Sequence, residues 1–195
     1  MTWNVPNILT LIRIAAIPLL MGVFVIPGWA GYVTSAVVFV LAAVTDWLDG
    51  YWARRYEQTS TFGAFLDPVA DKLMVATALV LLTADERVPA ILTVIIIGRE
   101  ITISALREWM AEIGKRAAVA VSWMGKVKTG AQMAAIVLLL LHAPVYGVDA
   151  HLWGMVLLTI AAILTLWSMT LYLKAALPMI LGTESGGEQG SAEEP

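Results

Sequence analysis

Cysteine is absent from this chain of 195 residues, and histidine occurs only twice, at His142 and His151. Without cysteine the protein has no disulfide and no thiolate chemistry, and a zinc site built from cysteine and histidine has too few ligands. Charged residues are also scarce, at 14% of the chain, whereas 59% is hydrophobic and the mean hydropathy is +0.81. A soluble core of this size cannot hide so much apolar surface, so the sequence predicts an all-α integral membrane protein.

Long apolar runs predict six membrane-spanning helices that form one domain, residues 1–181. We expect the helices to begin near Ile8, Gly31, Thr61, Pro89, Val127 and Leu152. The first run has no basic segment before it and no clear cleavage site after it, so it is interpreted as a retained helix. Residues 182–195, rich in glycine, serine and glutamate, are predicted to form a disordered acidic tail.

Two pairs of aspartates lie inside or beside these runs. Asp46 and Asp49 are one helical turn apart, and Asp67 and Asp71, at i and i+4, share a face of the next helix. An ionisable group at the centre of a membrane helix costs about 2.5–3.5 kcal/mol unless it is paired or functional. Because the link between the two pairs is short, we expect a helical hairpin whose carboxylates face each other.

Four neighbouring carboxylates stay ionised together only if positive charge lies among them. Two like charges about 4 Å apart repel by about 4 kcal/mol at an effective dielectric constant of about 20. Oxygen ligands select Mg²⁺, Mn²⁺ or Ca²⁺ rather than zinc, so we predict a binuclear divalent metal site on these four aspartates. The alternative is a set of separate carboxylates that are neutralised by protonation or by Arg54 and Lys72.

Small residues flank the aspartates at Gly50, Ala53 and Gly63. In membrane helices such residues commonly permit close packing between helices. Beside a metal site they would also leave room for a planar base or a diphosphate against the backbone. Both roles are compatible.

The complete pattern reads Asp-x-x-Asp-Gly-x-x-Ala-Arg, eight residues, then Gly-x-x-x-Asp-x-x-x-Asp, and it occupies residues 46–71. It resembles the motif of the CDP-alcohol phosphotransferases, with every fixed position matched. Segments 6–13, 99–116 and 118–133 also resemble the members of this family that act on glycerol phosphate. The resemblance covers about residues 4–175 and implies the family's six-helix transmembrane bundle and a homodimer.

The resemblance also implies that CDP-diacylglycerol and sn-glycerol 3-phosphate react to give phosphatidylglycerol phosphate and CMP. Asp71 is then the base that accepts the proton of the acceptor hydroxyl, and Mg²⁺ or Mn²⁺ is bound by the four aspartates. The residues expected to contact the nucleotide are Asp49, Gly50, Ala53, Arg54 and Gly63.

Basic residues gather at the end of the fourth run and after it. The residues expected to bind the phosphate of the acceptor, in no defined order, are Arg107, Arg116, Lys126 and Lys128. An excess of positive charge in cytosolic loops explains part of this cluster, but Arg99 lies too deep for that explanation. Arg13, the only charge in the first run, either reaches lipid phosphate or helps to bind a substrate phosphate.

The distribution of basic residues predicts that both termini and the aspartates lie on the cytosolic side of the membrane. The resemblance implies that this membrane is a bacterial inner membrane. Asp85, Glu86 and Arg87 then form a short outer loop, where we expect solvated charges. Membrane lipid is the expected surrounding, and no nucleic-acid partner is expected.

Three other functions are compatible with parts of this pattern. A membrane prenyltransferase also binds Mg²⁺-diphosphate through aspartate motifs, but its two motifs lie far apart in sequence. A cation or proton transporter would use intramembrane carboxylates, but it would not require the cytosolic basic cluster. Within the family, inositol phosphate, serine or choline could replace glycerol phosphate as the acceptor.

Overall fold

The computed structural model describes residues 5–56, 61–112, 123–142 and 149–180. The helices in these ranges are α1 (Val5–Phe24), α2 (Trp29–Tyr56), α3 (Thr61–Ala84), α4 (Ala90–Glu112), α5 (Trp123–Leu141) and α6 (Ala150–Ile180). No strand occurs in the described ranges, so the all-helical prediction is confirmed there. The helix starts agree with the sequence to within a few residues, and α6 continues to Ile180.

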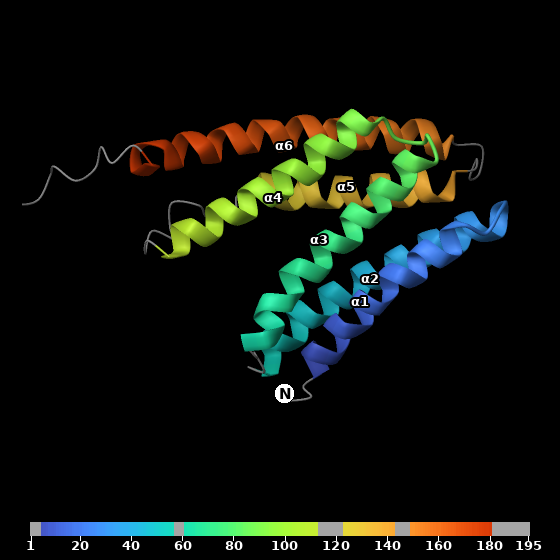
Figure 1. The fold of residues 1–195 in the computed structure, drawn as a ribbon, viewed down its shortest axis with the longest axis horizontal. Coiled ribbons are helices and arrows are strands. Elements are labelled where there is room, and N and C mark those ends of the chain that lie inside the picture. Colours follow the sequence, from blue (N-terminus) through green and yellow to red (C-terminus); the bar gives the residue numbers. More distant parts are fainter. Residues whose placement is uncertain (1–4, 57–60, 113–122, 143–148, 181–195) are drawn as a thin grey trace, which may run out of the picture.

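The helices run back and forth along the long axis of the molecule, and the C-terminal ends of α1, α3 and α5 lie at the same end (Figure 1). Helix α1 packs against α2 and α3, α5 packs against α6 and α2, and α4 packs against α6 and α3. The buried core between them includes Phe39 of α2, Leu79 and Leu82 of α3, Ile96 of α4, and Ile136 and Leu139 of α5. Helix α3 therefore contacts α1 as well as α4 and α5.

Arg87, in the turn between α3 and α4, is buried, so the prediction of a solvated charge is wrong for this residue. Its guanidinium lies over the rings of Phe24 and Tyr32. Its Nη1 donates hydrogen bonds to the carbonyl oxygens of Leu139 and Leu140, at 3.3 and 3.2 Å. The last carbonyls of a helix have no partner within the helix, so Arg87 caps α5 and joins it to α1, α2 and α3.

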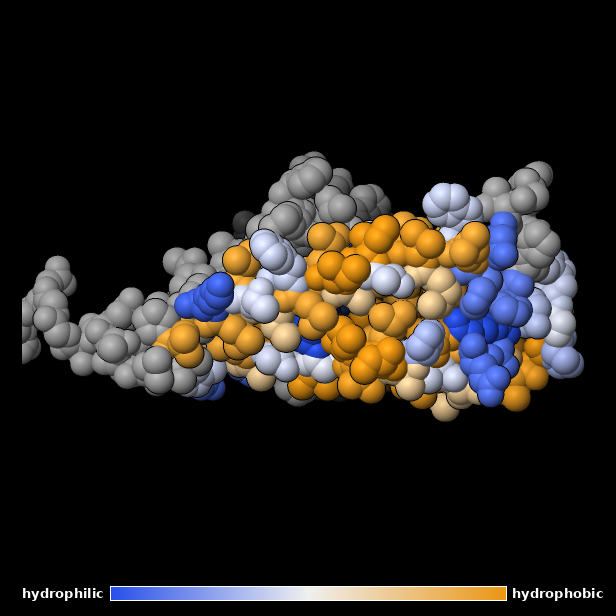
Figure 2. Space-filling view, turned by 90° about the horizontal axis from the view of Figure 1, so that it is seen from above, coloured by the Kyte–Doolittle hydropathy of each residue, from blue (hydrophilic) through white to orange (hydrophobic). Residues whose placement is uncertain are grey.

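The surface of the described helices is largely apolar. Helices α2 and α6 each contain a window long and apolar enough to cross a membrane, Trp29–Asp46 and Ala150–Lys174, and shorter apolar stretches occupy Ile8–Phe24 and Lys128–Leu141. Figure 2 shows hydrophobic residues across the middle of one face and hydrophilic residues toward the end where α3 turns into α4. Such a surface suits a lipid surrounding. That all six helices span the membrane stays a prediction.

Candidate active site

The aspartates lie on two consecutive helices, as the sequence predicts. Helix α2 carries Asp46 and Asp49, and α3 carries Asp67 and Asp71. The side chains of Asp46, Asp67 and Asp71 are partly buried, and that of Asp49 lies outside the described part. Asp46 acts electrostatically on Asp71. The two helices therefore bring carboxylates into one region.

Helix α1 supplies a polar partner to each side of this hairpin. Thr10 Oγ1 donates a hydrogen bond to Asp67 Oδ1, and Arg13 Nη1 lies 2.9 Å from Asp46 Oδ1. Thr10 and Arg13 are three residues apart and therefore share one face of α1. Because both side chains are buried, this face of α1 fixes Asp46 and Asp67 from inside the protein.

Arg13 is 1% exposed, so the interpretation in which it reaches lipid phosphate is wrong. Its guanidinium provides positive charge to the aspartates through the ion pair with Asp46 and through its attraction to Asp71. Lys72 adds a second positive charge near Asp71. Arg54, the other expected cation, lies in α2 with its side chain outside the described part.

The oxygen donors at this site are of the kind that Mg²⁺ and Mn²⁺ prefer. Among the side chains that the structure describes, no three carboxylate or imidazole groups lie together closely enough to hold an ion. Asp49, which follows Asp46 by one turn of α2, is not among these described side chains. The donor set fits a hard divalent cation in its chemistry, and the metal site itself stays a prediction.

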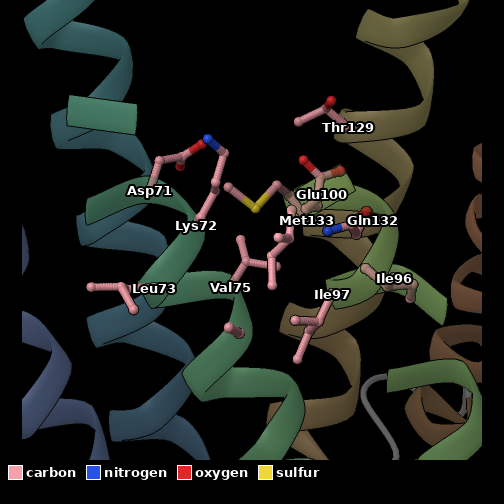
Figure 3. A pocket seen from close by; sticks show the side chains of 12 residues that line it. Asp71, Lys72, Leu73, Val75, Ile96, Ile97, Glu100, Thr129, Gln132 and Met133 are labelled. Carbon is pink, nitrogen blue, oxygen red and sulfur yellow. The ribbon is translucent and has the colours of Figure 1, made fainter. Parts of the chain in front are cut away.

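A cavity of about 190 Å³ opens beside Asp71, between α3, α4 and α5. Figure 3 shows Asp71 and Lys72 of α3 on one side and Glu100 of α4 with Thr129 and Gln132 of α5 on the other. Most of the remaining wall is apolar. The cavity therefore combines a few charged and polar groups with an apolar wall, which is the composition typical of ligand sites.

A second cavity, of about 530 Å³, lies between α3 and α4. It shares three charged residues with the first cavity: Asp71, Lys72 and Glu100. Its further polar lining residues are Arg99, Ser104, Arg107 and Glu108. Asp71 thus borders two adjoining cavities, one of which has two arginines in its wall.

Two of the four residues expected to bind the acceptor phosphate have described side chains. Lys128 of α5 is 3% exposed, and its Nζ donates to Glu100 Oε1 at 3.1 Å. Arg107 lines the second cavity, where its guanidinium carbon lies 5.6 Å from the centre of the Tyr172 ring. The side chain of Lys126 and the whole of Arg116 lie outside the described part.

The positions expected to contact the nucleotide follow the aspartates along the same two helices. Gly50 and Ala53 belong to α2, and the buried Gly63 belongs to the first turn of α3. The side chains of Asp49 and Arg54 lie outside the described part. The nucleotide contacts therefore stay a prediction.

Sequence reasoning misses two residues of this site, Thr10 and Glu100. Glu100 directly follows Arg99 and interrupts an apolar run. A charged residue inside a predicted membrane helix is a signal of function, and this signal could have identified Glu100. A threonine in a helix gives no such signal, because its hydroxyl is commonly satisfied by the backbone of the preceding turn.

Residues 3–167 match the family described as CDP-alcohol phosphatidyltransferase. A protein of Salmonella choleraesuis (strain SC-B67) named CDP-diacylglycerol–glycerol-3-phosphate 3-phosphatidyltransferase is 53% identical over 182 residues, which cover 90% of this chain and 96% of that protein. Proteins of the same name from Escherichia coli (strain K12) and Shigella flexneri serotype 5b are 52% and 51% identical over 182 residues, with the same coverage.

Proposed function

This chain belongs to the CDP-alcohol phosphatidyltransferase family, and on that premise we propose that it transfers the phosphatidyl group of CDP-diacylglycerol to sn-glycerol 3-phosphate. The products are phosphatidylglycerol phosphate and CMP. The observation that carries this proposal is the 53% identity to a relative named for that reaction, over 96% of the relative's length. The site supports it, because Asp71 borders cavities whose walls contain cations suited to phosphate.

In the proposed reaction, the free primary hydroxyl of the acceptor attacks the phosphorus that carries the diacylglycerol. A new P–O bond joins the acceptor to the phosphatidyl group, the P–O bond to CMP breaks, and CMP leaves with the bridging oxygen. The proton of the hydroxyl passes to Asp71, whose carboxylate borders both cavities. Thr10 and Arg13 hold the neighbouring aspartates in position.

We assign two divalent ions, Mg²⁺ or Mn²⁺, to Asp46, Asp49, Asp67 and Asp71. When bound, such ions neutralise charge on the diphosphate. The support for this assignment is the donor set, which consists of carboxylates on two adjoining helices with one shared polar partner helix, α1.

The two substrates would approach Asp71 from different sides. The nucleotide would lie along α2 and the start of α3, where the small residues Gly50, Ala53 and Gly63 would let a ligand approach the backbone and Asp49 and Arg54 would supply polar contacts. The acceptor would enter the cavities between α3, α4 and α5. Its phosphate would be bound by members of the set Arg107, Arg116, Lys126 and Lys128.

We propose that all six helices cross a bacterial inner membrane, with both termini and the site on the cytosolic side. We also propose that the protein is a homodimer. The apolar surface of the described helices supports the membrane assignment. The acyl chains of the donor would remain in lipid, and the water-soluble acceptor would arrive from the cytosol.

An acceptor screen on the purified protein in detergent tests this function. CDP-diacylglycerol is offered together with sn-glycerol 3-phosphate, inositol phosphate, serine or choline, and CMP release is measured with Mg²⁺ and after chelation. We expect release with sn-glycerol 3-phosphate and Mg²⁺, and none after chelation. Preference for another acceptor would refute the acceptor assignment, and full activity after chelation would refute the metal assignment.

A further inference from the structure

A buried charge cluster joins α4, α5 and α6 beside the candidate active site. Glu100 Oε1 accepts hydrogen bonds from Arg99 Nη1 at 2.7 Å and from Lys128 Nζ at 3.1 Å. Arg99 extends the cluster to α6, where its Nη2 donates to Ser168 Oγ at 3.2 Å. Arg99 and Lys128 are 9% and 3% exposed, so this cluster holds two cations in the protein interior.

Glu100 makes it possible for these two cations to lie side by side. Two positive groups that donate to the same oxygen would repel each other without a negative charge between them. A buried ammonium group without a counter-charge either loses its proton or moves toward water. Glu100 therefore provides the counter-charge that Arg99 and Lys128 share, and it holds Lys128 Nζ in place.

The position of Glu100 connects this cluster to the chemistry. Its side chain is 30% exposed, and it lines both cavities together with Asp71 and Lys72. Figure 3 shows Glu100 across the first cavity from Asp71. Arg99 lines the second cavity, whereas Lys128 lines neither cavity and is joined to both through its hydrogen bond to Glu100. The two cations would therefore attract a phosphate that enters the cavities next to the proposed base.

We propose that Glu100 is a positioning residue for the acceptor substrate. It fixes Lys128 and Arg99 as the positive charges that attract the acceptor's phosphate beside Asp71, with Arg99 in the wall of the second cavity and Lys128 next to Glu100. Glu100 acts through Lys128 and touches no reacting atom. This inference rests on the proposed function and adds the residue that keeps the acceptor side of the site assembled.

The experiment compares Glu100→Gln, Lys128→Met and the double variant with the wild type. The sn-glycerol 3-phosphate concentration is varied at saturating CDP-diacylglycerol, and then the donor is varied at saturating acceptor. Glu100→Gln removes the negative charge that holds the two cations, so it should raise the acceptor KM about tenfold and change the donor KM less than about twofold. In the Lys128→Met background the same substitution should raise the acceptor KM by less than about twofold, because the ammonium group through which Glu100 acts is then absent.

Two further variants make the result specific. Glu86→Gln, an exposed substitution at the far end of α3, should leave both KM values unchanged. Glu100→Asp keeps the negative charge and should give an acceptor KM between those of the wild type and Glu100→Gln. If Glu100→Gln does not fold, the Glu100→Asp variant decides: an increase confined to the acceptor KM supports the proposal, and an equal increase in both KM values overturns it.

A fall in kcat with both KM values unchanged would overturn the proposal, as would effects of Glu100→Gln and Lys128→Met that multiply in the double variant. Failure of the proposed function looks different. In that case the wild type itself releases no CMP in response to sn-glycerol 3-phosphate. An active wild type with an unaffected Glu100→Gln variant refutes only the positioning role.

Discussion

Replacing Arg13 with methionine tests whether α1 supplies the counter-charge for the aspartate hairpin. Arg13 is 1% exposed, and its partner Asp46 is 45% exposed. Loss of one partner from a buried pair costs about 3–5 kcal/mol, whereas a fully exposed pair contributes about 0–1 kcal/mol. Because water reaches Asp46, we expect a loss of about 2 kcal/mol in the free energy of unfolding, which lowers the Tm of a chain of this size by about 4–8 °C.

Thermal unfolding of the purified protein in detergent, followed by the fluorescence of its eight tryptophans, measures this loss. Arg107→Met is the control, because Arg107 is exposed and its contact with Tyr172 is worth about 0.5 kcal/mol, or about 1–2 °C. Combining Arg13→Met with Asp46→Asn should destabilise less than the sum of the two single changes. A Tm for Arg13→Met within about 1 °C of the wild type, or strict additivity in the double variant, would refute the reasoning.

The other predictions concern the base, the acceptor, the cap of α5 and a histidine. Asp71→Asn should lower turnover by a factor of about 10²–10⁴ and spare donor binding; retained CMP release would remove Asp71 from the role of base. Arg116→Ala should raise the KM for sn-glycerol 3-phosphate more than the KM for the lipid donor, and an equal rise would count against the assignment. Arg87→Met leaves the last carbonyls of α5 without their donor and should cost about 1.5–3 kcal/mol, seen as a lower Tm, with activity at low temperature retained. Partial burial, the Arg87 guanidinium and the His151 imidazole lower the pKa of His142, so the unfolded chain binds more protons than the folded protein, and stability falls as the pH drops through the usual titration range of histidine. His142→Gln should flatten that dependence when the Tm is measured between pH 8 and pH 5, and an unchanged slope would show that His142 does not cause it.

Much of the fold could be predicted from the sequence because its signals are local. Apolar runs bounded by polar or turn residues locate the helices, and the spacing of Asp46 with Asp49 and of Asp67 with Asp71 places each pair on one helix. The helix positions, and with them the two-helix platform of the site, follow from these patterns. The family match covers residues 3–167 and therefore includes the motif at residues 46–71, which lies on α2 and α3.

The contacts that complete the site depend on tertiary packing and could not be predicted. Thr10 and Asp67 are separated by 57 positions and meet only because α1 packs beside α3. Glu100 and Lys128 are separated by 28 positions, and neither local spacing nor charge identifies them as partners. Arg87 lies in a short polar turn, which predicts a solvated side chain, and its burial depends on rings from α1 and α2 and carbonyls from α5.

We propose that the acidic sides of α2 and α3 bind divalent ions between the two helices. An anomalous difference map from a crystal soaked in Mn²⁺, recorded at the manganese absorption edge, measures this directly. We expect anomalous peaks between α2 and α3, in contact with the carboxylates of Asp46, Asp49, Asp67 and Asp71. A crystal of active protein whose manganese peaks lie elsewhere, with none between these helices, would contradict it.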